Sequence, residues 1–139
     1  MTRVRPTMNP SALGALVLVF LALQVRAEEL VVIVNPAAAP ISKEQLADLY
    51  LGKSSALIPI DQAADSVIYA EFYKKATGRD SAQVKAIWSR ILFTGRGAPP
   101  KQLPDSAAVK KAVAANPKAV GYIEKSAVDA SVKVALPLD

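Results

Sequence analysis

The stretch "IDQAADSVIYAEFY", Ile60–Tyr73, decides the fold, because it leads from an apolar segment through a polar turn into a helical pattern. A strand that passes through a short turn into a helix is the repeating unit of α/β proteins. The helix is expected to span about 66–76, and its apolar stripe is expected to include Val67, Ile68 and Phe72.

The turn between this strand and helix has two interpretations. Backbone N–H groups at the start of a helix can bind a phosphate or a carboxylate. Alternatively, Asp65 or Ser66 only caps the helix, and Asp61 and Gln62 are ordinary turn residues. The turn carries two carboxylates and no Arg, Lys or Gly, so its composition favours the cap.

Segments before the turn fit the same kind of fold. "LVVIV", Leu30–Val34, is apolar on both faces, as in strands buried in the middle of a sheet that helices cover. Asn35 follows it, either as a turn residue or as a ligand-binding residue at the carboxyl edge of the sheet. "ISKEQLADLYLGK" is typical of a capped helix, with Ser42 as N-cap, Gln45 completing a capping box and Gly52 ending the helix.

A second helical pattern follows the turn region over 81–93, and its apolar spacing places Trp88 in the core. Gly95 fits the position just after the end of this helix. The segment "FTGRGAPP", Phe93–Pro100, therefore has two interpretations. It is a helix end followed by a loop, or it is a Gly-Arg-Gly turn that presents Arg96 to an anion.

The last part of the chain supplies a loop, a helix and two strands. "GRGAPPKQLPD" is expected to be irregular, "SAAVKKAVAAN" to be helical, and "AVGYI" and "SVKVALPL" to be strands. Helices that alternate with strands predict an α/β fold with a mixed, mostly parallel sheet flanked by helices.

Residues 1–27 have the layout of a secretory signal peptide. A basic start is followed by the apolar run "ALGALVLVFLAL", and Val25 and Ala27 are the small residues at the −3 and −1 positions. The run is shorter than the roughly 20 residues that a membrane span needs. Cleavage after Ala27 is therefore predicted, with an uncleaved anchor as the alternative. The mature chain, 28–139, is then a single periplasmic domain without a membrane span.

The composition of the mature chain excludes several classes of function. Without Arg3, Arg5 and Arg26, its 14 basic residues face 12 acidic ones, and this balance does not indicate nucleic-acid binding. The chain contains no Cys and no His. The usual zinc and copper ligands, catalytic triads and imidazole acid–base chemistry are therefore missing. No catalytic residue, metal site or cofactor is predicted.

Several segments in order resemble the phosphate-binding proteins of bacterial ABC importers, which are type 2 periplasmic solute-binding proteins. These segments are "VVIVNP", "ISKEQLADLYLGK", "NPKAVGYIEKSAV" and "VKVALPL". The family's "F-x-G-K" corresponds to Tyr50–Lys53, and its "G-A-I-G-Y-V" corresponds to Lys118–Ile123. Members of this family have two lobes that clamp the ligand. The resemblance implies that 28–139 is a single periplasmic-binding-protein-like lobe, similar to the second of the two.

The resemblance also implies where an anion would bind. The family's phosphate turn reads R-x-x-x-S-G-T, with a Phe ten residues after the Arg. Aligned on Phe72, Gln62 takes the Arg position and Ser66 the Ser position, while Val67 and Ile68 replace Gly and Thr. Gln lacks the charged fork that binds phosphate, so binding is expected to be weak. The candidate anion-binding residues are Asn35, Gln62, Ser66 and Arg96.

Two functions follow from these observations. The first is a secreted solute-binding-type protein that resembles the phosphate-binding component of an ABC transporter and binds phosphate or another small oxyanion weakly. The alternative is a periplasmic protein-interaction module that kept the fold and lost the ligand. Its partner would be an envelope protein or a second copy of the chain. Nothing in the sequence points to an enzyme.

Overall fold

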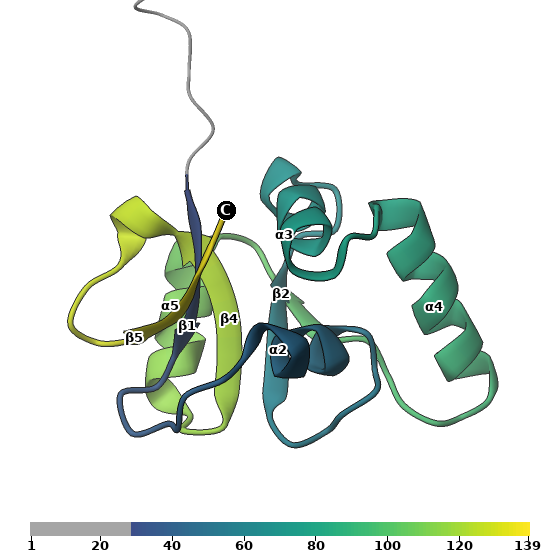
Figure 1. The fold of residues 1–139 in the computed structure, drawn as a ribbon, viewed down its shortest axis with the longest axis horizontal. Helices are drawn as coiled ribbons and strands as arrows, with labels where there is room; N and C mark the ends of the chain where they lie inside the picture. The colour runs from purple at the N-terminus through teal and green to yellow at the C-terminus, as the bar shows by residue number, and fades with distance from the viewer. Residues whose placement is uncertain (1–28) are drawn as a thin grey trace, which may run out of the picture.

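Residues 29–139 are described by a computed structural model (Figure 1). The expected signal peptide, 1–27, lies outside the described residues. The strands are β1 (Leu30–Val34), β2 (Ile58–Gln62), β3 (Lys101–Leu103), β4 (Ala119–Glu124) and β5 (Lys133–Leu138). The helices are α2 (Lys43–Tyr50), α3 (Val67–Thr77), α4 (Ser81–Phe93) and α5 (Ser106–Ala115), with a 3-10 turn, η1 (Lys125–Ala127), before β5.

The five strands form one sheet in the order β3-β2-β4-β1-β5. β2 runs parallel to both β3 and β4, whereas β1 runs antiparallel to both β4 and β5. Four strands therefore point the same way and β1 alone opposes them. This arrangement confirms the expected mixed, mostly parallel sheet, and it confirms the inner position of "LVVIV".

Helices cover both faces of the sheet (Figure 1). α2, α3 and α4 lie on one face and α5 lies on the other. The alternation of side chains along β1 explains why this strand is apolar throughout. Leu30, Val32 and Val34 belong to the cluster with α2, α3 and α4. Val31 and Ile33 belong to the cluster with α5.

The ends of the helices agree with the sequence signals. Ser42 and Gln45 form the expected capping box of α2, and Gly52 follows that helix with a φ of +79°. Ser66 rather than Asp65 is the N-cap of α3. Gly95 follows α4 with a φ of +71°, as its predicted position requires.

The structure corrects three details of the sequence analysis. The loop expected to be irregular contains β3, which pairs in parallel with β2. Val67 is 77% exposed, whereas Tyr73 is fully buried. The reason is that Ser66 caps the helix, so Val67 opens its first turn on the solvent side. Asp61 and Gln62 are not turn residues but the last two residues of β2, and both are buried.

Each helical layer is fixed by a close contact at a defined position. Trp88 on α4 is buried, as predicted, and its indole Nε1 donates to the backbone oxygen of Tyr50 over 3.0 Å. On the other face, a Cβ at Gly121 in β4 would lie 2.5 Å from Val109 Cγ1 and 3.2 Å from Val113 Cγ2 of α5. The absence of a side chain at Gly121 therefore allows α5 to pack closely against the sheet.

Among the described helices, none has both the length and the apolar composition of a membrane span.

Candidate functional site

The end of β2 carries a buried carboxylate held by two tyrosines. Asp61 Oδ1 accepts a hydrogen bond from the Tyr122 hydroxyl, and Oδ2 accepts one from the Tyr73 hydroxyl, each over 2.9 Å. Asp61 is only 2% exposed. The two donors come from β4 and α3, so the carboxylate joins the sheet to the helix that covers it.

The environment of Asp61 changes its protonation. Burial raises the pKa of this carboxyl to about 7, against the smaller lowering effect of the hydrogen bonds from Tyr73 and Tyr122. Burial and the nearby charge of Asp61 raise the pKa of both tyrosines well above the ordinary value. An ionised Asp61 at this position would repel an oxyanion that approached the turn.

Gln62 is committed to contacts within the fold. Its Nε2 donates to Ser106 Oγ and to the backbone oxygen of Tyr122, each over 3.0 Å. Its backbone N–H donates to the Tyr122 hydroxyl, also over 3.0 Å. Gln62 is 3% exposed. Its side chain therefore connects β2 to the first residue of α5 and does not project from the turn.

Ser66 acts as a helix cap. Its Oγ accepts the backbone N–H of Tyr69 over 3.2 Å and donates to the backbone oxygen of Ala63 over 2.6 Å. The N–H groups of Val67 and Ile68, in the first turn of α3, have no hydrogen-bond partner within residues 29–139. These two amides are the donors that the start of α3 offers to an anion.

Asn35 lies at the opposite end of the sheet from Gln62. Because β1 opposes its neighbours, Val34 is level with Val120 of β4, and Val120 pairs with Pro59 at the start of β2. The Asn35 side chain donates to the backbone oxygens of Val113 over 3.3 Å and Ala114 over 3.0 Å. The structure therefore does not bring Asn35 and the β2–α3 turn together.

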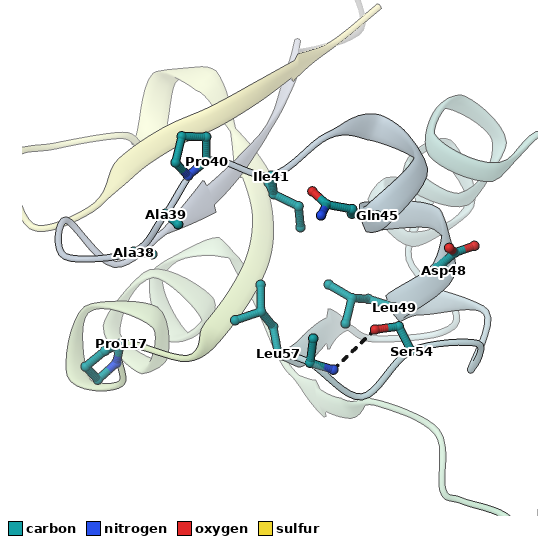
Figure 2. A pocket seen from close by; sticks show the side chains of 11 residues that line it. Ala38, Ala39, Pro40, Ile41, Gln45, Asp48, Leu49, Ser54, Leu57 and Pro117 are labelled. Atoms are coloured by element: carbon teal, nitrogen blue, oxygen red, sulfur yellow. Dashed lines mark hydrogen bonds between the residues drawn. The ribbon is translucent and has the colours of Figure 1, made fainter.

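A hollow of about 200 Å³ lies beyond Asn35, between the loop after β1 and α2 (Figure 2). Ile41, Leu49 and Leu57 converge in it, and the only charged side chain among its lining residues is the carboxylate of Asp48. An apolar pocket with a carboxylate and no cation does not suit an oxyanion.

Arg96 lies apart from the other three candidates. It is exposed in the loop after α4, and its Nε donates to Thr94 Oγ1 over 3.4 Å. Arg96 lines a hollow of about 550 Å³ that also receives Lys53, Arg79 and Arg90. We call this hollow the basic pocket. It contains none of Asn35, Gln62 or Ser66.

The sequence analysis missed Lys53, Arg79 and Arg90 as candidate residues because it weighed the basic residues only by their number against the acidic ones. The signal that could have found them is the position of each one. Lys53 and Arg79 each follow the glycine at the end of a helix, and Arg90 lies in the last turn of α4. No group of three or more metal-ligating His, Cys, Asp or Glu side chains occurs within 29–139.

The fold is similar to one half of several solved transport receptors. The chain matches an ABC-type phosphate transport receptor from Vibrio cholerae at a TM-score of 0.59 and 22% identity, over 77% of this chain and 45% of the receptor. It matches a protein described as a phosphate ABC transporter substrate-binding protein from Clostridium perfringens, with bound phosphate, at a TM-score of 0.61 and 19% identity, over 78% and 44%.

The chain thus spans less than half the length of these two structures. No protein-family model matches the sequence, and no curated protein resembles it significantly. At these identities the comparisons establish the fold, a periplasmic-binding-protein-like lobe.

Proposed function

We propose that this chain is an exported, periplasmic solute-binding-type protein and not an enzyme, with phosphate or another small oxyanion as its class of ligand. The observation that carries the proposal is the match of the described lobe to half of two phosphate-transport proteins. The expected signal peptide over 1–27 supports the periplasmic location.

Binding of phosphate at the β2–α3 turn is expected to be weak. The side chain of Gln62 is occupied by Ser106 and Tyr122, and the hydroxyl of Ser66 caps α3. The N–H groups of Val67 and Ile68 are then the donors left for an anion, and Asp61 is the second-to-last residue of β2, just before the turn. A dissociation constant in the millimolar range, about −4 kcal/mol, is the natural result.

Titration of isotope-labelled protein with phosphate, followed by amide chemical shifts, tests this proposal. Saturable shifts at Val67 and Ile68 in the millimolar range are expected. Sulfate serves as a second tetrahedral oxyanion, and sodium chloride at matched ionic strength serves as the control. The absence of any saturable shift with phosphate or sulfate, anywhere in the protein, would contradict the solute-binding function. Micromolar affinity at the turn would contradict the expected weakness.

One observation favours the alternative, a protein-interaction module. Phe93 and Leu92 at the end of α4 are 92% and 52% exposed. Exposed apolar side chains that adjoin one another mark protein–protein contacts more often than isolated ones do. Sedimentation equilibrium of the wild type and of Phe93→Ser tests association with a second copy. Loss of a wild-type dimer in the variant would support the module, and a monomer in both would count against self-association.

A further inference from the structure

All three arginines of the described residues meet at one place. Arg79, Arg90 and Arg96 are the only arginines within 29–139, and each of them lines the basic pocket. Lys53 is the fourth cation of its lining, and no Asp or Glu belongs to that lining. Arg is the side chain best suited to bidentate contacts with phosphate, because its guanidinium presents a rigid planar fork of donors.

Three helix ends bring these cations together. Lys53 follows the end of α2, Arg79 follows the end of α3, and Arg90 lies in the last turn of α4. The segment just after α2 and the residues of α4 approach closely here. A Cβ added to Gly52 would lie only 2.5 Å from Ile91 Cδ1 of α4. Gly52 and Ile91 both line the pocket. Lys53 follows Gly52 and Arg90 precedes Ile91, so both cations lie around the same hollow.

The cations of the pocket form no ion pair with a carboxylate within the described part of the chain. The two ion pairs found there join Lys110 to Asp129 and Lys125 to Glu29, and neither involves a cation of the pocket. Arg79 Nε is the one buried side-chain nitrogen or oxygen in 29–139 without a hydrogen-bond partner. A buried donor without an acceptor is costly, so the guanidinium of Arg79 lacks part of the hydrogen bonding that a buried donor normally has.

A structural role explains part of this arrangement. A cation near the C-terminus of a helix interacts favourably with the helix dipole, and each of Lys53, Arg79 and Arg90 has such a position. That interaction stabilises each cation separately. It does not account for four like charges around one hollow, which repel one another, or for the unpartnered Nε of Arg79.

We propose that the basic pocket binds a soluble anion with two or more phosphate groups, of the diphosphate class. One phosphate group carries roughly −1.5 to −2 charges near neutral pH, so two such groups match four cations. The volume of about 550 Å³ also falls within the range of small-molecule pockets, roughly 300–1,000 Å³. Leu51 and Ile91, both buried, give the pocket an apolar floor. This site is distinct from the β2–α3 turn and does not depend on phosphate binding there.

Titration calorimetry on the exported chain, in magnesium-free buffer at constant ionic strength, tests this proposal. The ligands are pyrophosphate and orthophosphate. The variants are Arg79→Gln, Arg90→Gln and the double variant. Lys118→Gln is the matched control, because it removes one positive charge from an exposed residue between α5 and β4, outside the pocket. Thermal melting of each variant separates lost binding from lost folding.

Pyrophosphate is expected to bind at least about tenfold more tightly than orthophosphate, with affinity that falls as salt rises. Each arginine variant should weaken pyrophosphate binding by about tenfold or more, and Lys118→Gln should change it less than about threefold. Pyrophosphate binding that is no tighter than orthophosphate binding, or that is the same in the double variant, would overturn the proposal. Orthophosphate-induced amide shifts at Val67 and Ile68, together with pyrophosphate binding that is the same in the double variant, would support the proposed function while overturning this second site.

Discussion

The indole of Trp88 on α4 is hydrogen bonded to the backbone oxygen of Tyr50 at the end of α2. The same tyrosine places its hydroxyl 2.8 Å from the backbone oxygen of Ile60 in β2 and 3.1 Å from that of Val120 in β4. Tyr50 therefore connects the outer helix to the middle of the sheet, and Trp88 holds one end of that connection.

Replacement of Trp88 by Ala should lower the free energy of unfolding by roughly 3–5 kcal/mol, because it removes a large buried side chain and leaves a cavity. Trp88→Phe should lower it less, since most of the packing remains and only the hydrogen bond to Tyr50 is lost. Urea unfolding measures both variants. A loss below about 1 kcal/mol in Trp88→Ala would mean that the indole is not part of the core.

The raised pKa of Asp61 should make the protein less stable as the pH rises from about 4 to about 7. The pKa of this carboxyl is about 7 in the fold and 3.8 ordinarily. Over that interval the folded state binds more protons than the unfolded state, so the free energy of unfolding falls with pH. The slope from this group is at most about 1.4 kcal/mol per pH unit.

Asp61→Asn should remove this component of the pH dependence and should be more stable than the wild type near pH 7.5. Urea unfolding at a series of pH values from 4 to 8 measures the slope. Asp65→Asn, at an exposed position in the turn that follows β2, is the control. An unchanged slope in Asp61→Asn would show that the buried carboxylate does not control the stability.

Gln62→Arg tests the difference between the sequence analysis and the structure. The alignment with the family suggested that an Arg here would supply the missing phosphate fork. The burial of Gln62 against Ser106 predicts instead that a guanidinium would be left as an unpaired buried charge, at a cost of roughly 3–5 kcal/mol. Urea unfolding and phosphate titration decide between them. A stable variant with tighter phosphate binding would favour the family alignment.

Gly121→Ala should destabilise the contact between α5 and the sheet. The added methyl group would lie 2.5 Å from Val109 Cγ1, so α5 must move outward. Overpacking of this kind typically costs about 1–3 kcal/mol. Thermal melting measures the loss. The double variant Gly121→Ala with Val109→Ala should recover part of it, and the absence of any recovery would mean that another contact is responsible.

Export should yield a mature protein that begins at Glu28. The basic start, the apolar run and the small residues at Val25 and Ala27 predict cleavage after Ala27. Intact mass of protein from the periplasmic fraction measures the N-terminus. Recovery of chains that retain Met1, in the membrane fraction, would instead support an uncleaved anchor. Ala27→Lys should block cleavage, because a large charged side chain cannot take the −1 position.

Local signals in the sequence were sufficient for the helices. The side chain of Ser42, the amide of Gln45 and the glycines after α2 and α4 act within a few residues of themselves, so their roles do not depend on the rest of the fold. Features that depend on distant partners were not predictable. The direction of β1 is set by β4 and β5, and no local pattern encodes it.

The candidate site shows the same limit. Asp61 and Gln62 look like turn residues in the sequence, but in the fold they contact Tyr122 and Ser106 and are buried. These partners lie 44 or more residues away along the chain, so no local pattern reveals the contacts. β3 escaped prediction because three residues are too few to show a period of two. Lys53 and the three arginines meet because the C-terminal ends of α2, α3 and α4 lie close together. The order of charges along the chain does not show this.

The inner position of β1 has a consequence for the order of events during folding. β1 is the first strand of the described chain, yet both strands that flank it, β4 and β5, come from its last 21 residues. Contacts so distant in sequence form slowly, because a long loop must close before they are gained. "LVVIV" therefore has no hydrogen-bonding neighbour until the end of the chain has emerged. A chain with this strand order completes its sheet only when its last two strands are available to pair with its first.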